Sequence, residues 1–96
     1  MTTQLADGMA CRVADPEALA IIAPHTERIV QVSDDEVAAA MRAIFTDTHN
    51  AAEGAGAAAF AAALQERSRL TGQTVGVALT GGNVDAPLFA QTLAAR

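Results

Sequence analysis

The most regular pattern of hydrophobic and polar positions in the chain follows Ser33. Ser33 and Glu36 have the spacing of a capping box, in which the serine caps the first turn of a helix and the glutamate reaches back to the cap. Downstream, five apolar residues recur at helical spacing and define one face: Val37, Ala40, Met41, Ile44 and Phe45. The pattern predicts a helix with this face buried. The acidic run 34–36 then complements the helix dipole, an interpretation that we prefer to a metal or acid/base role.

Two more helices are predicted from their starting residues. Asp15 as a cap and Pro16 at the first helical position begin a short helix over EALAII, which Pro24 is expected to end. Near the end of the chain, Asp85 as a cap and Pro87 just inside the first turn begin another helix. Its apolar residues are Leu88, Phe89 and Leu93.

A fourth helix is predicted after Glu53, which is set among small residues and glycines. The stretch that follows is apolar and carries Phe60 and Leu64. It turns polar at Gln65–Arg69, where arginines suit the negative end of the helix dipole. Gly72 can supply a left-handed stop beyond it.

Two short runs between the helices are rich in β-branched residues and predict strands: Arg28–Val32 and Thr74–Leu79. The second is an almost unbroken apolar run, typical of a strand buried on both faces. The order helix, strand, helix, helix, strand, helix predicts an α/β fold with a partial parallel-sheet layer, as a single partial domain over residues 1–96. Two strands do not make a stable sheet, so we expect neighbours from missing sequence, a partner chain or self-association.

The composition suggests that the core of this chain is weak on its own. Hydrophobic residues make up 51% of the chain, but 24 residues are alanine, which contributes little transfer free energy per side chain compared with leucine, isoleucine or phenylalanine. A chain of 96 residues also buries a smaller fraction of its surface than a mid-sized domain. We therefore interpret the chain as a piece that packs inside a larger body.

Charge and reactive residues argue against several classes of function. A net charge of −5, with six scattered arginines, argues against a nucleic-acid partner. No apolar run is long enough to cross a bilayer, so we expect a soluble, cytoplasmic protein without a membrane partner. Cys11 is the single cysteine, and His25 and His49 lack further ligands at suitable spacing, so we assign no metal. The chain has no lysine, so no Schiff base can form on it.

Three stretches carry a resemblance to a known family: LADGMACR at Leu5–Arg12, HNAAEGAGAAAFAA at His49–Ala62 and ALTGGNVD at Ala78–Asp85. In this order, with VSDDEVAAAMR between the first two, they resemble the carboxyl-terminal part of the catalytic domain of serine/threonine dehydratases. These are fold-type II pyridoxal-phosphate enzymes, which include threonine ammonia-lyase and serine racemase. The resemblance covers nearly all of the chain and implies a fragment of the fold-type II, tryptophan synthase β-like fold.

The resemblance implies four cofactor-binding residues. Thr80 occupies the position of a family hydroxyl, usually a serine, that hydrogen-bonds the pyridine nitrogen of pyridoxal phosphate. Glu53 matches a glutamate close to the ring, Gly8 matches a glycine that borders the cofactor, and Gly81 follows Thr80 in the same motif. From the residues alone, Glu53 could also be an exposed acid at a helix start. Gly81 and Gly82 could form no more than a tight turn.

A complete relative would eliminate the β-hydroxyl of a hydroxy amino acid and release a 2-oxo acid and ammonia. The resemblance places the catalytic lysine and the phosphate loop in the amino-terminal portion of the domain, so covalent attachment of the cofactor is impossible on this chain. We expect no catalytic residue here, no activity from the chain alone, and an amino-acid substrate only if a lysine-bearing amino-terminal part completes the site.

Two alternatives remain open. One is a non-enzymatic interaction module that forms a homo-oligomer or docks on a full-length relative through its alanine-rich helices. The other is a small anion-binding α/β protein that uses the TGGN turn without pyridoxal chemistry, although this turn lacks a fuller phosphate fingerprint.

Overall fold

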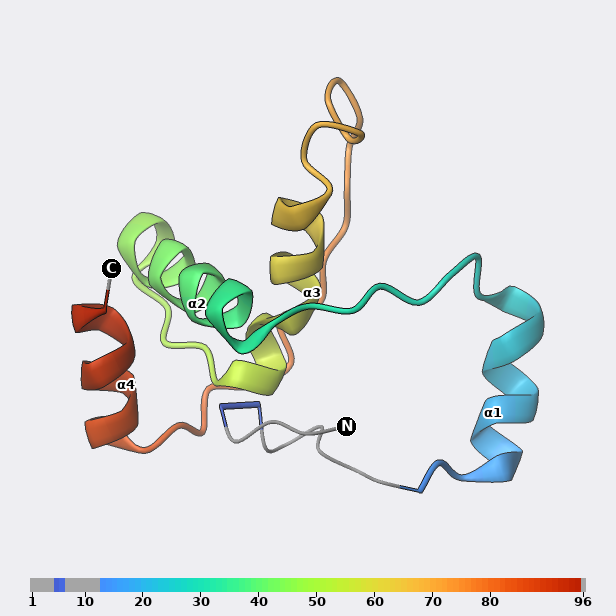
Figure 1. The fold of residues 1–96 in the computed structure, drawn as a ribbon, viewed down its shortest axis with the longest axis horizontal. Helices are drawn as coiled ribbons and strands as arrows, with labels where there is room; N and C mark the ends of the chain where they lie inside the picture. The colour runs from blue at the N-terminus through green and yellow to red at the C-terminus, as the bar shows by residue number, and fades with distance from the viewer. Residues whose placement is uncertain (1–4, 7–12, 96) are drawn as a thin grey trace.

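The computed structural model describes residues 5–6 and 13–95, and within these ranges the regular structure is helical (Figure 1). The helices lie close to where the sequence predicts them. In chain order they are α1 Pro16–Ile22, the 3-10 helix η2 Ala23–His25, α2 Asp34–Thr48, α3 Gly54–Gln65 and α4 Ala86–Ala94.

Local caps begin these helices. The Glu17 amide donates to the Asp15 carboxylate at 3.0 Å at the start of α1. At the start of α2 both hydrogen bonds of the capping box form: the Glu36 amide donates to Ser33 Oγ at 3.1 Å, and the Ser33 amide donates to Glu36 Oε1 at 2.8 Å. The predicted capping box between Ser33 and Glu36 is therefore confirmed. Asp85 stands at the cap position of α4, but its side chain makes no capping hydrogen bond.

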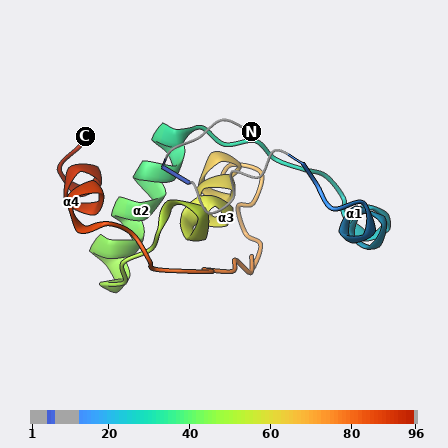
Figure 2. The ribbon, with the colours of Figure 1, turned by 90° about the horizontal axis from the view of Figure 1, so that it is seen from below.

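The core lies between α2 and α3, and α2 separates α3 from α4 (Figures 1 and 2). Its buried members are Val37, Ala40, Met41 and Ile44 of α2, together with Ala52, Ala57 and Ala61. Phe45, which we predicted on the buried face, is instead 37% exposed. It packs edge-on against Phe89 of α4, with ring centroids 5.5 Å apart, because it faces α4 rather than α3.

The described residues contain no β-strand, so the predicted parallel-sheet layer is not confirmed. The predicted strands Arg28–Val32 and Thr74–Leu79 run as long connections without helical structure (Figure 1). A strand is defined by backbone hydrogen bonds to a neighbouring strand. Within the described residues, neither segment makes a backbone hydrogen bond of this kind. In the second segment, Val75, Val77 and Leu79 remain 45%, 39% and 48% exposed.

Helix α1 stands apart from the other helices in both views (Figures 1 and 2). It buries no residue, and its apolar side chains Leu19, Ile21 and Ile22 are exposed. The connection that follows η2 is anchored to the end of α3. Arg28 makes a two-pronged ion pair with Glu66, in which Nη2 lies 2.6 Å from Oε1.

Two residues with positive φ end segments of the chain. Gly72 has a φ of 79°, as predicted, although α3 itself ends at Gln65 and turns fill the interval. His49 has a φ of 61° and closes α2, with its amide donating to Phe45 O at 2.9 Å. Glycine is the usual residue in this position, so the sequence carried no signal for His49.

None of the helices in the described part of the chain is long and apolar enough to cross a membrane.

Candidate functional site

Two segments that are distant in the sequence meet at the start of α3. Glu53 occupies the cap position of this helix and has extended backbone geometry. Its amide donates to the carbonyl oxygen of Gly81 at 3.0 Å. The helix that follows Glu53 and the loop that follows residue 79 are therefore joined by a backbone hydrogen bond, and two of the predicted site residues lie together.

Missing side chains allow this loop to lie directly on the chain around the start of α3. A Cβ atom at Gly56 would lie 2.6 Å from Gly81 O and 2.9 Å from Gly81 N. A Cβ atom at Gly82 would lie 2.6 Å from Ala51 O. These distances are shorter than van der Waals contact, and in both cases the atoms that would be struck are backbone. The loop keeps this position only because both residues are glycine.

The carboxylate of Glu53 fills space that a side chain at position 81 would need. A Cβ atom at Gly81 would overlap Glu53 Oε1. The glutamate side chain is half-buried and makes no capping hydrogen bond of its own. Its placement therefore depends on the absence of a side chain at Gly81.

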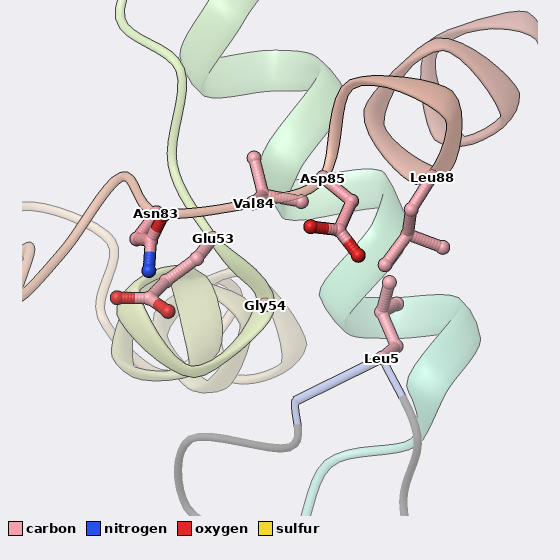
Figure 3. Close-up of a pocket in the computed structure, with 7 residues that line it drawn as sticks. All are labelled: Leu5, Glu53, Gly54, Asn83, Val84, Asp85 and Leu88. Carbon is pink, nitrogen blue, oxygen red and sulfur yellow. The ribbon is translucent and has the colours of Figure 1, made fainter.

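A pocket of about 330 Å³ lies between the start of α3 and the loop before α4 (Figure 3). In Figure 3 the Asp85 carboxylate points into the space beside Leu88 and Leu5, and the side chains of Glu53 and Asn83 are drawn on the opposite side. The lining residues are Leu5, Glu53, Gly54, Asn83, Val84, Asp85 and Leu88. Among the described residues, the lining holds two carboxylates and no basic side chain, so this part of the pocket suits a ligand that donates hydrogen bonds and does not suit a phosphate.

Thr80 lies outside the lining of this pocket and is exposed. Its hydroxyl has no hydrogen-bond partner in the part of the chain that the structure describes. Thr80 is bonded directly to Gly81, which accepts a hydrogen bond from Glu53 and lies against Gly56.

The four predicted cofactor-binding residues therefore differ in where they lie. Glu53 lines the pocket, Gly81 contacts Glu53, and Thr80 extends beyond the pocket with a free hydroxyl. Gly8 lies outside the described residues. Among the described residues, no group of three or more histidine, cysteine, aspartate or glutamate side chains is arranged to hold a metal ion.

Sequence reasoning missed two contributors to this site. Gly56 was not singled out, because a glycine within an alanine-rich helix gives no sign of what lies against it. Asn83 entered the sequence analysis only as part of the TGGN turn, but it lines the pocket. Its position directly after the glycine pair was the one signal in the sequence.

Known proteins resemble this chain over most of its length. The family model for pyridoxal-phosphate dependent enzymes matches residues 1–81. A phenylserine dehydratase of Ralstonia pickettii is 43% identical over 76% of this chain and 26% of its own length. An L-threonine ammonia-lyase of Geobacter sulfurreducens is 40% identical over 88% of this chain and 21% of its own length. An L-threo-3-hydroxyaspartate ammonia-lyase of Saccharomyces cerevisiae is 30% identical over 96% of this chain and 28% of its own length.

The chain spans between 21% and 28% of the length of these three curated relatives.

Proposed function

The chain belongs to the family of pyridoxal-phosphate-dependent enzymes, and we propose that residues 53–56 and 80–85 form the ring side of the cofactor site in a dehydratase of hydroxy amino acids. One observation carries the proposal: the hydrogen bond from the Glu53 amide to Gly81 O joins the two segments that the resemblance places beside the cofactor. The names of the relatives point to elimination from a β-hydroxy amino acid as the reaction class.

The residues present fit the ring of the cofactor and do not fit its phosphate. Thr80 is exposed, and its hydroxyl makes no hydrogen bond within the described part of the chain. The glycines that follow it have no side chain to block the approach of a flat ring to the backbone. The described lining of the adjoining pocket is acidic and holds no basic side chain, so we propose that the phosphate is held by residues other than these. When bound, pyridoxal phosphate supplies an electron sink for the electrons that remain on the substrate α-carbon.

Thr80 and Glu53 have separate roles in this proposal. The Thr80 hydroxyl donates a hydrogen bond to the unprotonated ring nitrogen, which favours the neutral ring over the protonated one. The Glu53 carboxylate would border the ring, and it occupies space that is open only because Gly81 has no side chain. Neither residue moves the α-proton. Because the 96 residues contain no lysine, both the covalent attachment and that base belong to another segment of polypeptide.

We also propose that the same missing polypeptide completes a parallel sheet. Residues 74–79 make no backbone hydrogen bond to the described part of the chain, and their alternate side chains Val75, Val77 and Leu79 are about half exposed. The unpaired N–H and C=O groups of such a segment can form backbone hydrogen bonds with neighbouring strands. The remainder of a family domain, about three quarters of each relative's length, is the partner that this proposal requires.

A second candidate function rests on α1. Its side chains Leu19, Ile21 and Ile22 are 49%, 66% and 55% exposed, and the helix buries none of its residues. This exposed apolar surface favours a non-enzymatic module that self-associates or docks on a full-length relative. Light scattering on the pure chain tests self-association. A chain that is exclusively monomeric at all concentrations argues against it.

The experiment that tests the proposed function uses a chimera, in which this chain replaces the stretch that it matches in the L-threonine ammonia-lyase of Geobacter sulfurreducens. The absorption spectrum of the bound cofactor is recorded as a function of pH, with Thr80 and with Thr80→Val, which keeps the shape and removes the hydroxyl. We expect the two spectra to differ, because the valine cannot donate to the ring nitrogen. Identical spectra at every pH would exclude the role proposed for Thr80.

A further inference from the structure

Three glycines near the site differ in what an added methyl group would meet. At Gly56 it would strike the backbone of Gly81. At Gly81 it would strike the carboxylate of Glu53, the far end of a flexible side chain. At Gly76, on the segment that leads to Thr80, it would meet open space. The same chemical change at these positions therefore tests a rigid contact, a soft contact and no contact.

The contact at Gly56 acts on the peptide unit that carries Thr80. Gly81 N, which lies 2.9 Å from where the added Cβ would be, is bonded to the carbonyl carbon of Thr80. Gly81 O, at 2.6 Å, is also the acceptor of the Glu53 amide. A methyl group at position 56 must therefore push Gly81 off the helix and weaken this hydrogen bond, and the displacement passes directly to Thr80.

Nothing else in the described structure holds the Thr80 side chain. It is exposed, and its hydroxyl has no protein partner in the described part of the chain. The location of the hydroxyl is consequently set by the backbone of residues 80 and 81. That backbone is fixed at two points, the hydrogen bond from Glu53 and the close contact with Gly56.

We propose that Gly56 is a positioning residue for Thr80: its missing side chain lets the Gly81 peptide rest on α3 and so sets where the Thr80 hydroxyl meets the cofactor ring. This role rests on the proposed function of Thr80. It predicts that Gly56→Ala disturbs the site even though alanine is the better helix former, so an adverse effect cannot arise from helix propensity.

The first test is amide hydrogen exchange on the full 96-residue chain, read at the Glu53 amide by NMR. We expect Gly56→Ala to accelerate this exchange by about tenfold or more, because the acceptor at Gly81 is displaced. Gly76→Ala is the matched control and should leave the exchange within about twofold of the parent chain. Exchange in Gly56→Ala that stays within the range of this control would overturn the proposal.

The second test uses the chimera and remains informative if Gly56→Ala unfolds the free chain. The cofactor spectrum is compared for Gly56→Ala, Thr80→Val and Ser68→Ala, a control on an exposed turn. We expect Gly56→Ala to shift the spectrum and its pH dependence in the same direction as Thr80→Val, with Ser68→Ala matching the parent. If Thr80→Val alters the spectrum and Gly56→Ala does not, the positioning role is wrong while the role of Thr80 stands. If Thr80→Val has no effect, the proposed function itself fails.

Discussion

Met41 is the largest fully buried side chain in the described core. It lies in α2 and has no exposed surface. The fully buried side chains that α3 contributes to the core are alanines, and its larger side chains Phe60 and Leu64 are only partly buried against it. Short side chains cannot reach across to fill a space left by a neighbour. The core therefore has little capacity to adapt to a loss of volume at this position.

Met41→Ala should destabilise the chain by about 2–5 kcal/mol, from lost transfer free energy and an unfilled cavity. The measurement is urea unfolding followed by circular dichroism. Leu19→Ala is the control, because Leu19 is 49% exposed, and it should change the free energy of unfolding by less than about 0.5 kcal/mol. Equal losses from the two substitutions would mean that the core does not lie between α2 and α3.

Single residues also show how far the sequence can predict a site. The glycine pair after Thr80 could be interpreted from the sequence as no more than a tight turn, whereas in the structure Gly81 and Gly82 lie against the chain around the start of α3, which no local pattern specifies. Glu53 and Gly81 could be assigned to one site from the sequence only through the family resemblance. Gly56 could not be found at all, since its importance lies in a neighbour that is close only in space.

At the scale of elements, α2 is the helix whose start is most fully defined, because both hydrogen bonds of its capping box form. Ser33→Ala removes the acceptor of the Glu36 amide and should lower the free energy of unfolding by about 1 kcal/mol. Asp85→Ala is the matched control, since Asp85 occupies the same position in α4 without a capping hydrogen bond. Thermal unfolding of both variants checks this prediction, which fails if Asp85→Ala is as costly as Ser33→Ala.

Two carboxylates at helix ends should make the chain sensitive to acid. Hydrogen bonds from Arg28 lower the pKa of Glu66, and the backbone amide of Ser33, followed by Gln65, lowers the pKa of Glu36. Both pKa values lie below those of the unfolded chain, so the unfolded state binds protons more readily. The stabilisation is complete above the unfolded pKa, which is about 4.3 for glutamate, and is lost as the pH falls through the folded pKa.

We therefore expect the free energy of unfolding to be constant near neutral pH and to decrease below about pH 4.3. Glu66→Gln should reduce this decrease, because its side chain does not titrate. Glu17→Gln serves as the control, since Glu17 forms no ion pair in the described part of the chain. Urea unfolding across the acid range supplies the measurement, and an unchanged pH profile in Glu66→Gln would contradict the assignment.

Helices were easier to predict than strands for a physical reason. The signals that begin α1 and α2 are local, because Asp15 and Ser33 bond to amides within three residues. A strand instead needs a hydrogen-bonded neighbour, and the segments 28–32 and 74–79 do not provide one for each other. Phe45 shows the same limit, because helical spacing placed it beside the core but could not tell which neighbouring helix it would face.

At the scale of the whole molecule, apolar side chains are buried in one part of the described chain and exposed in another. Helices α2, α3 and α4 pack together, whereas α1 and the segment 74–79 leave their apolar side chains exposed. The radius of gyration of 14.1 Å is accompanied by principal dimensions of 40 × 35 × 18 Å, a flat and extended shape. Both features agree with a piece that packs inside a larger body, as the alanine-rich composition indicated.

Val77→Asp tests this interpretation in two contexts. In the free chain the side chain is 39% exposed, so the charge should change the free energy of unfolding by only about 0.5 kcal/mol. In the chimera we expect loss of folded, cofactor-binding enzyme, because the proposed sheet would bury an unpaired charge. Ser68→Asp adds the same charge on an exposed turn and should be tolerated in both. A chimera that accepts Val77→Asp would show that this segment joins no sheet.

The most direct measurement is the release of a 2-oxo acid from threonine and serine, by the pure 96-residue chain and by the chimera. The proposed function predicts no release by the chain alone, which has no lysine, and threonine- or serine-dependent release by the chimera that depends on Thr80. Robust release by the chain alone, or a folded and cofactor-bound chimera that releases none, would contradict the conclusion that these residues form one wall of a dehydratase site.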